Sequence, residues 1–134
     1  LDLDLEGTKV IIGKGPNLNK LKKKYPNDFF LVEKTNGELA SHFASSDVFV
    51  FPSKTDTFGI VVLESLSCGT PVAAYPVPGP KDILGGSKID TLDQDLKTSA
   101  LKALKVNRED CLEFAKKYSW EETARIFYNN ISPN

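Results

Sequence analysis

Short apolar segments alternate with helical patterns along most of the chain, and this alternation limits the folds that are open to it. Strands are expected at residues 9–13, 29–33, 47–52 and 71–75, with a weak edge strand at 88–91. Helices are expected at residues 16–25, 37–46, 58–68, 80–84, 92–105, 108–117 and 120–131. Strands that alternate with helices indicate a parallel sheet. We therefore expect one α/β domain over residues 1–134, with a doubly wound, Rossmann-like parallel sheet.

The composition is that of an ordinary globular domain of 134 residues, with 40% hydrophobic and 26% charged residues. A formal net charge of −1 gives no electrostatic reason to expect a nucleic acid partner. No apolar run approaches the roughly 18 residues of a membrane span, and no signal peptide pattern precedes the fold. Cys68 and Cys111 are expected to be buried thiols in a reducing cytoplasm, with one disulfide as the alternative. The chain does not begin with Met, so we expect it to be a fragment.

Residues 51–80, FPSKTDTFGIVVLESLSCGTPVAAYPVPGP, carry the clearest indication of chemistry. Glu64 stands in mid-helix among residues that are expected to be core, where an ionised carboxylate costs several kcal/mol unless it has partners. Four residues at the start of the same helix have amides without a helical acceptor: Thr57, Phe58, Gly59 and Ile60. A helix start followed one turn later by an acid suits a ligand with phosphate at one end and hydroxyls at the other.

Each of these residues also has a purely structural interpretation. Asp56 or Thr57 could serve as an ordinary helix cap, and Glu64 could be a solvated residue on the edge of the helix. Lys54 is either a cation for phosphate or a solvated lysine. A glycosidase pair is excluded, because its carboxyl groups lie about 5–5.5 Å or about 6.5–9.5 Å apart. The step from Asp56 to Glu64 would rise about 12 Å along a helix.

The segment resembles the nucleotide-sugar-binding domain of family 4 glycosyltransferases, which are retaining enzymes of the GT-B fold. The family signature is two glutamates separated by seven residues, within conserved Pro-Ser, Phe-Gly and Gly-x-Pro-Val elements. The positions that match it are Pro52-Ser53, Asp56, Phe58-Gly59, Glu64, Gly69 and Pro71-Val72. The segments at residues 9–16, 39–53 and 118–131 resemble further parts of the same domain. The first acid departs from the pattern, because Asp56 is one methylene shorter than glutamate.

The resemblance implies a role for each site residue. Asp56 would lie beside the donor sugar and the reacting carbon, as the catalytic acid of the signature. Thr57, Phe58, Gly59 and Ile60 would bind the diphosphate through their amides, and Glu64 would hold the ribose hydroxyls. The turn with Gly13 and Gly15, together with residues 33–37, would surround the nucleobase. No metal site is expected, since His42 is the only histidine.

The implied reaction transfers a hexose from a UDP-sugar or GDP-sugar to an acceptor with retention, and the TDTFG and PVPGP segments favour a bacterial mannosyltransferase-like enzyme that uses GDP-mannose. No cofactor is implied. In the family, the domain opens with a strand and a helix that carry an Arg and a Lys for the diphosphate. We expect this chain to lack that first strand and most of the helix.

The chain is thus expected to be one half of a GT-B fold, without the N-terminal domain that binds the acceptor. We therefore expect it to be inactive alone. The full-length enzyme would be cytoplasmic and could be peripheral to the inner membrane. Membrane contact is not expected from this domain itself. The alternative is a non-catalytic module of GT-B-like fold that binds a nucleotide or a sugar phosphate.

Overall fold

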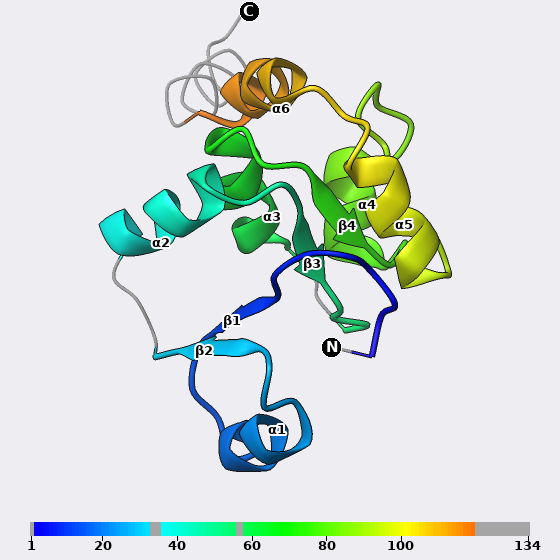
Figure 1. The fold of residues 1–134 in the computed structure, drawn as a ribbon. Helices are drawn as coiled ribbons and strands as arrows, with labels where there is room; N and C mark the ends of the chain where they lie inside the picture. Colours follow the sequence, from blue (N-terminus) through cyan, green and yellow to red (C-terminus); the bar gives the residue numbers. More distant parts are fainter. Residues whose placement is uncertain (1, 33–35, 56–57, 120–134) are drawn as a thin grey trace, which may run out of the picture.

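The structure is a computed structural model that describes residues 2–32, 36–55 and 58–119 (Figure 1). Within these ranges, strands and helices alternate over the first part of the chain, and helices follow. The strands are β1 (Val10–Ile12), β2 (Phe29–Leu31), β3 (Phe49–Phe51) and β4 (Val72–Ala74). The helices are α1 (Leu18–Lys24), α2 (Asn36–Ala44), α3 (Ile60–Ser67), α4 (Pro78–Leu84), α5 (Leu96–Ala103), α6 (Arg108–Ala115) and a 3-10 helix, Lys116–Tyr118. The helix expected at 120–131 lies outside the described residues.

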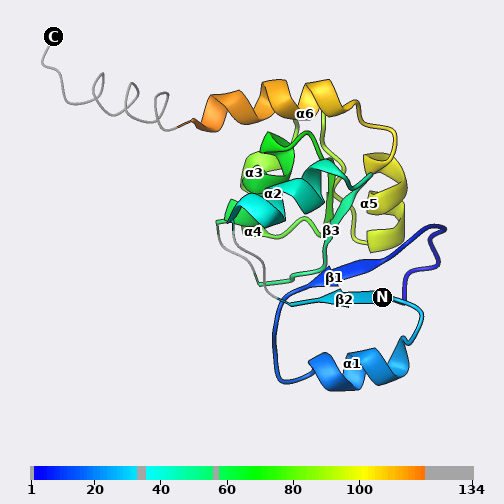
Figure 2. The same ribbon diagram turned by 60° about the vertical axis from the view of Figure 1, so that its left-hand side comes forward.

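The described strands form two parallel pairs. In one pair Val10 of β1 lies opposite Phe29 of β2, and in the other Phe49 of β3 lies opposite Val72 of β4. No ladder joins the two pairs within the described residues, and Figures 1 and 2 show that they run in different directions. The α/β class with parallel, Rossmann-like strand–helix units is therefore confirmed. The strands are divided between two pairs rather than combined in one continuous sheet.

The core surrounds β4, which is buried along its whole length. On one side it packs with α3, α4 and α6; the buried residues of this cluster include Val62, Leu66, Leu84, Cys111 and Phe114. On the other side α5 lies against β4, where Ala73 meets Ala100 and Ala103. These small side chains let the helix approach the strand closely. Cys68 is half-buried and Cys111 is buried, and both are free cysteines.

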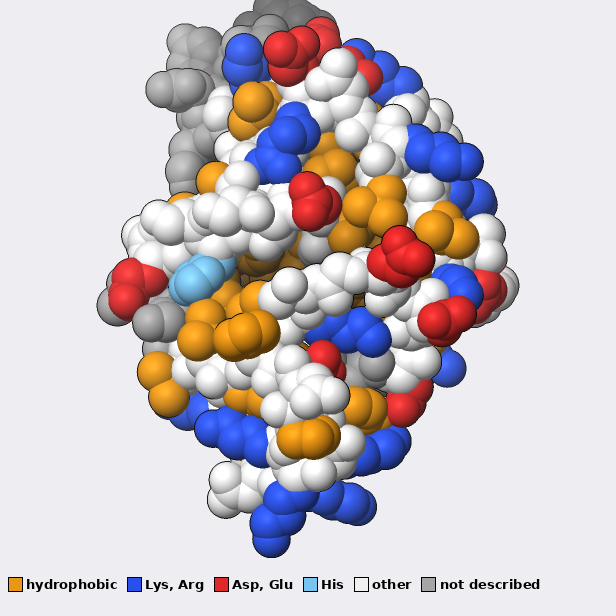
Figure 3. Space-filling view, in the orientation of Figure 1, with side chains coloured by type: hydrophobic (Ala, Val, Ile, Leu, Met, Phe, Trp, Pro, Cys, Tyr) orange, Lys and Arg blue, Asp and Glu red, His pale blue; other side chains and the backbone are white. Residues whose placement is uncertain are grey.

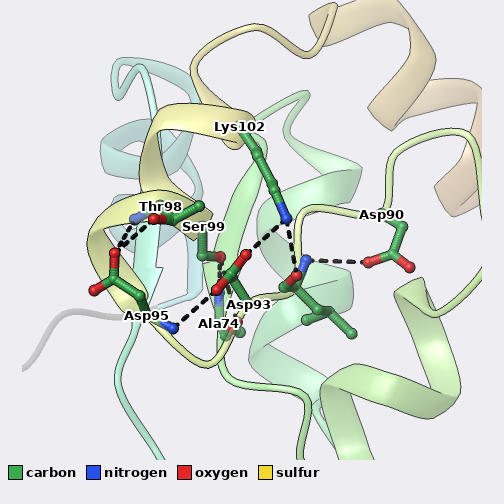
Figure 4. Close-up of polar contacts among 8 residues, drawn as sticks. Ala74, Asp90, Asp93, Asp95, Thr98, Ser99 and Lys102 are labelled. Atoms are coloured by element: carbon green, nitrogen blue, oxygen red, sulfur yellow. Dashed lines mark hydrogen bonds and ion pairs between the residues drawn. The ribbon is translucent and has the colours of Figure 1, made fainter.

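The outer edge of β4 is closed by the segment that leads into α5 (Figure 4). The Thr91 hydroxyl donates to the Val72 carbonyl, and the Asp93 amide donates to the Ala74 carbonyl over 3.3 Å. The Ser99 hydroxyl accepts from the Ala74 amide at 3.0 Å. Side-chain and turn contacts therefore satisfy an edge that would otherwise be open to another strand.

The prediction of a weak edge strand at residues 88–91 is wrong. Residues around Lys88 form a turn instead, with the Asp90 amide donating to the Ser87 carbonyl over 3.1 Å. The chain reaches β4 with the Thr91 side chain rather than with a backbone ladder. A single hydroxyl contact replaces the run of alternating backbone bonds that a strand needs.

Polar contacts fix the ends of α5 (Figure 4). The Asp95 side chain caps α5 by accepting from the Thr98 amide at 3.0 Å, so that this helix starts later than the sequence pattern predicted. The hydroxyl and amide of Thr98 hold the pKa of the Asp95 carboxyl below its usual value. Lys102 pairs with Asp93 at 2.8 Å, and this bond is the main cause of the lowered pKa of Asp93.

The surface carries both signs of charge, with a basic region at one end of the molecule. Figure 3 shows Lys and Arg side chains gathered at the lower end, which α1 occupies in Figure 1. The exposed lysines of α1 are Lys20, Lys22, Lys23 and Lys24. In the described part of the chain, no helix is long and apolar enough to cross a membrane.

Candidate functional site

Of the signature residues that the structure describes, Pro52 and Ser53 follow β3, Phe58 and Gly59 precede α3, and Glu64 lies within α3. Asp56 and Thr57 fall outside the described residues, so the structure gives no position for either side chain. Phe58, the next residue, is 67% exposed. The described part of the candidate site therefore consists of the residues from Phe58 onward and of the loop residues before Asp56.

Gly59 fixes the start of α3. Its φ of 73° and ψ of 33° lie in the left-handed region, which glycine adopts without the steric cost that a Cβ imposes. Its carbonyl accepts from the amides of Val62 at 2.9 Å and Leu63 at 3.3 Å, and the helix runs from Ile60. A glycine at this position supplies no side-chain cap. Among the described residues, no side chain accepts from the amides of Ile60 and Val61, which can therefore bind an external acceptor.

Glu64 lies on the exposed face of α3. Ile60, one turn earlier on the same face, is 59% exposed, so its assignment to the core was wrong. Val62 and Leu66 point inward and are buried. Because the carboxylate is in contact with solvent, it does not carry the burial cost that the sequence suggested. It is instead accessible about one helical turn beyond the helix start.

Gly13 and Gly15 form the turn after β1, in the other strand pair. The Gly13 amide donates to the Leu31 carbonyl at 3.2 Å, and the Gly15 carbonyl accepts from the Leu18 amide at 3.1 Å. A Cβ added at either glycine would meet nothing within 4 Å, so the turn borders open space. No described hydrogen bond or ion pair joins this turn to α3. The structure thus places Phe58, Gly59, Ile60 and Glu64 at and just after the start of α3, and Gly13 and Gly15 in the turn between β1 and α1.

A hollow of about 150 Å³ lies at the carboxyl ends of β3 and β4. It is lined by Lys54, Tyr75, Pro76, Val77 and Gln94, and the Lys54 ammonium lies 4.9 Å from the centroid of the Tyr75 ring. Lys54 was a candidate from the sequence, whereas Tyr75 and Gln94 were not predicted. Tyr75 could have been found, because it ends a predicted parallel strand and ligands bind beyond the carboxyl ends of such strands. Gln94 has no comparable signal.

Other titratable groups add little to the site. Burial, together with the charge of Glu64, raises the pKa of the Cys68 thiol, which is therefore protonated at neutral pH. His42 is half-buried on α2. Within the ranges that the structure describes, no three His, Cys, Asp or Glu side chains are grouped to hold a metal ion.

Comparison with known proteins gives a consistent result. The family model of glycosyl transferases group 1 matches residues 7–118. A D-inositol 3-phosphate glycosyltransferase of Geodermatophilus obscurus is 36% identical over 93 residues, which are 63% of this chain and 21% of that protein. A GDP-mannose-dependent alpha-mannosyltransferase of Mycolicibacterium smegmatis is 39% identical over 75 residues, which are 56% of this chain and 20% of that protein.

A third relative aligns over more of the chain. A probable sucrose-phosphate synthase of Thermosipho melanesiensis is 30% identical over 121 residues, which are 82% of this chain and 29% of that protein. The chain therefore spans less than a third of the length of each of these relatives.

Proposed function

This chain belongs to the glycosyl transferases group 1 family, and from that premise we propose that it is the donor-binding domain of a retaining glycosyltransferase. The proposed reaction moves a hexose from a UDP-sugar or GDP-sugar to an acceptor. The observation that carries the proposal is the glycine-capped start of α3, with Glu64 exposed one turn further along the helix.

The two ends of this surface suit the two parts of a nucleotide sugar. The amides of Phe58, Gly59 and Ile60 and the positive end of the helix dipole favour a diphosphate. Glu64 lies four residues after Ile60, a rise of about 6 Å along the helix. A carboxylate at that distance can accept hydrogen bonds from two neighbouring ribose hydroxyls. Asp56 is proposed to lie by the donor sugar, and Gly13 and Gly15 by the nucleobase.

Catalysis in this proposal rests on positioning and on stabilising the diphosphate as it leaves. The helix start supplies fixed amide donors for the charge that develops there. The GDP-mannose-dependent relative makes GDP-mannose the donor to test first. The reacting groups of the proposed fold face each other across two domains. We therefore expect the polypeptide of residues 1–134 to bind nucleotide weakly and to transfer no sugar by itself.

The test is nucleotide binding by two variants of α3. Glu64→Ala should weaken GDP or UDP binding by about 1.5–3 kcal/mol, because hydrogen bonds to a charged group are lost. Glu109→Ala, which removes an exposed glutamate of α6, is the matched control and should leave the affinity unchanged. Unchanged affinity in a folded Glu64→Ala variant would remove Glu64 from the site.

Gly59→Val tests the helix start. The new side chain would crowd the diphosphate, so nucleotide binding should be abolished. Because φ at Gly59 is 73°, a Cβ also strains the backbone by about 1–2 kcal/mol. A cooperative thermal melt must therefore accompany the binding assay, and Gly59→Ala provides a milder second variant. Normal nucleotide binding by either folded variant would show that the α3 amides do not bind the phosphates.

A further inference from the structure

The hollow beside Tyr75 is distinct from the α3 surface that carries the proposed function. Lys54 follows β3 and Tyr75 directly follows β4, and these two strands are parallel neighbours. Gln94 reaches the hollow from the segment before α5. Ligands of open parallel α/β sheets bind beyond the carboxyl ends of the strands, which is where these three side chains meet.

The charge of Lys54 is not neutralised by any carboxylate of the described residues. Other lysines of this part of the chain form ion pairs: Lys24 with Asp2, Lys88 with Asp110, Lys97 with Asp4 and Lys102 with Asp93. The described contact of Lys54 is with the face of the Tyr75 ring, 4.9 Å from its centroid. An aromatic face attracts the ammonium but accepts none of its three hydrogen bonds in the way that an oxygen does.

Lys54 is the charged residue among the described lining groups of the hollow. Within the described ranges, no carboxylate lines it. Asp93, the acid next to Gln94, is already paired with Lys102 at 2.8 Å and accepts from the Asp95 amide at 2.9 Å. Pro76 has no amide proton, and the Val77 amide donates to the Tyr75 carbonyl at 2.8 Å. The polar groups that remain for a ligand are the Lys54 ammonium, the Tyr75 hydroxyl and the Gln94 amide.

We propose that this hollow is a phosphate subsite in which Lys54 leaves the Tyr75 ring to bind a phosphoryl oxygen of the substrate. An exposed cation–π contact is weaker than a charge-assisted hydrogen bond to phosphate, so the exchange favours the bound state. The Tyr75 ring holds the ammonium near the hollow before the ligand arrives, and Gln94 binds an adjacent hydroxyl or phosphoryl oxygen. This inference rests on the proposed function, because the phosphate belongs either to the donor diphosphate or to a phosphorylated sugar.

The experiment is a titration of the ¹⁵N-labelled chain, followed by NMR, with pyrophosphate, UDP, glucose 6-phosphate and glucose. The variants are Lys54→Ala, Tyr75→Leu and Tyr75→Phe, with Lys105→Ala as the matched control. Lys105 is an exposed lysine that follows α5 and does not line the hollow. Lys54→Ala should weaken binding of a phosphate ligand at least about tenfold, while Lys105→Ala should leave it unchanged. Tyr75→Phe keeps the ring and should lose at most the small contribution of the hydroxyl. Tyr75→Leu should bind no more weakly than Tyr75→Phe, because the ring contact of Lys54 is broken on binding.

The probes separate the two sources of phosphate. A loss with pyrophosphate and UDP assigns the subsite to the donor diphosphate, whereas a loss with glucose 6-phosphate alone assigns it to a phosphorylated sugar. Equal affinities of Lys54→Ala and the parent chain for all three phosphate ligands would overturn the subsite. Equal losses in Lys54→Ala and Lys105→Ala would do the same.

The outcome is independent of the test of the proposed function. If UDP binding depends on Glu64 but not on Lys54, the function stands and the subsite fails. If pyrophosphate binding depends on Lys54 while UDP and GDP bind no more tightly than pyrophosphate, the subsite stands and the donor-site proposal fails.

Discussion

Replacing Ser99 with alanine tests how the edge of β4 is held. The Ser99 hydroxyl is fully buried, accepts from the Ala74 amide at 3.0 Å and donates to the Ala74 carbonyl at 3.3 Å. In Ser99→Ala the Ala74 carbonyl still accepts from the Asp93 amide at 3.3 Å, but the Ala74 amide has no described acceptor left. A buried donor without an acceptor costs about 1–3 kcal/mol. The better helix propensity of alanine returns at most about 0.5 kcal/mol.

The expected net loss is therefore about 0.5–2.5 kcal/mol in the free energy of unfolding. For a chain of this size it corresponds to a fall in Tm of about 2–9 °C. Thermal and urea unfolding followed by circular dichroism measure it. Ser67→Ala is the matched control, because Ser67 is an exposed serine at the end of α3 with the same change in composition. Equal Tm values for the two variants would refute the idea that Ser99 satisfies the edge of β4.

The Arg108 guanidinium donates to the carbonyls of Ser46 at 2.7 Å and Ala44 at 2.6 Å. Arg108→Met should therefore lower the free energy of unfolding by about 1–2 kcal/mol, and Arg108→Lys should lower it by less. Equal stability of the parent chain and both variants would contradict this role. Burial raises the pKa of Cys111 to about 11, so the folded chain keeps a proton that the unfolded chain loses. Stability should therefore fall as pH rises from about 9 to about 11, more steeply than in Cys111→Ala; equal slopes would contradict the raised pKa. Glu64→Gln should retain part of the nucleotide affinity that Glu64→Ala loses, and calorimetry measures both affinities. A loss equal to that of Glu64→Ala would show that hydrogen bonding by this side chain needs its charge.

The sequence predicted the region around β3, α3 and β4 well because its signals are local. A short apolar run, a turn with Gly59, an apolar helix and a break at Gly69 each favour one conformation. Gly69 has a φ of 74° just after α3, which is the conformation that ends many helices. The observed elements are shorter than predicted by one or two residues at most ends, since helix and strand boundaries depend on contacts that the pattern does not show.

The features that the sequence did not predict depend on contacts between distant segments. Glu64 was expected to be buried because its neighbours are apolar, yet Ile60 and Glu64 share the exposed face while Val62 and Leu66 face the core. Which face of an apolar helix is covered depends on the neighbouring elements, and here α6 and β4 pack on the buried face. Gln94 reaches the hollow only because the segment before α5 closes the edge of β4.

In the proposed function, the start of α3 binds the diphosphate of the sugar donor and Glu64 binds the ribose hydroxyls. The most direct measurement is an NMR titration of the ¹⁵N-labelled chain with GDP and UDP, compared with the Glu64→Ala variant. Saturable shifts are expected in the amides of Gly59, Ile60 and Glu64, with a dissociation constant in the high micromolar to millimolar range, about −4 to −6 kcal/mol. A weaker affinity is expected for Glu64→Ala. Saturable shifts confined to other parts of the chain, or none for α3 at millimolar nucleotide, would contradict this binding mode.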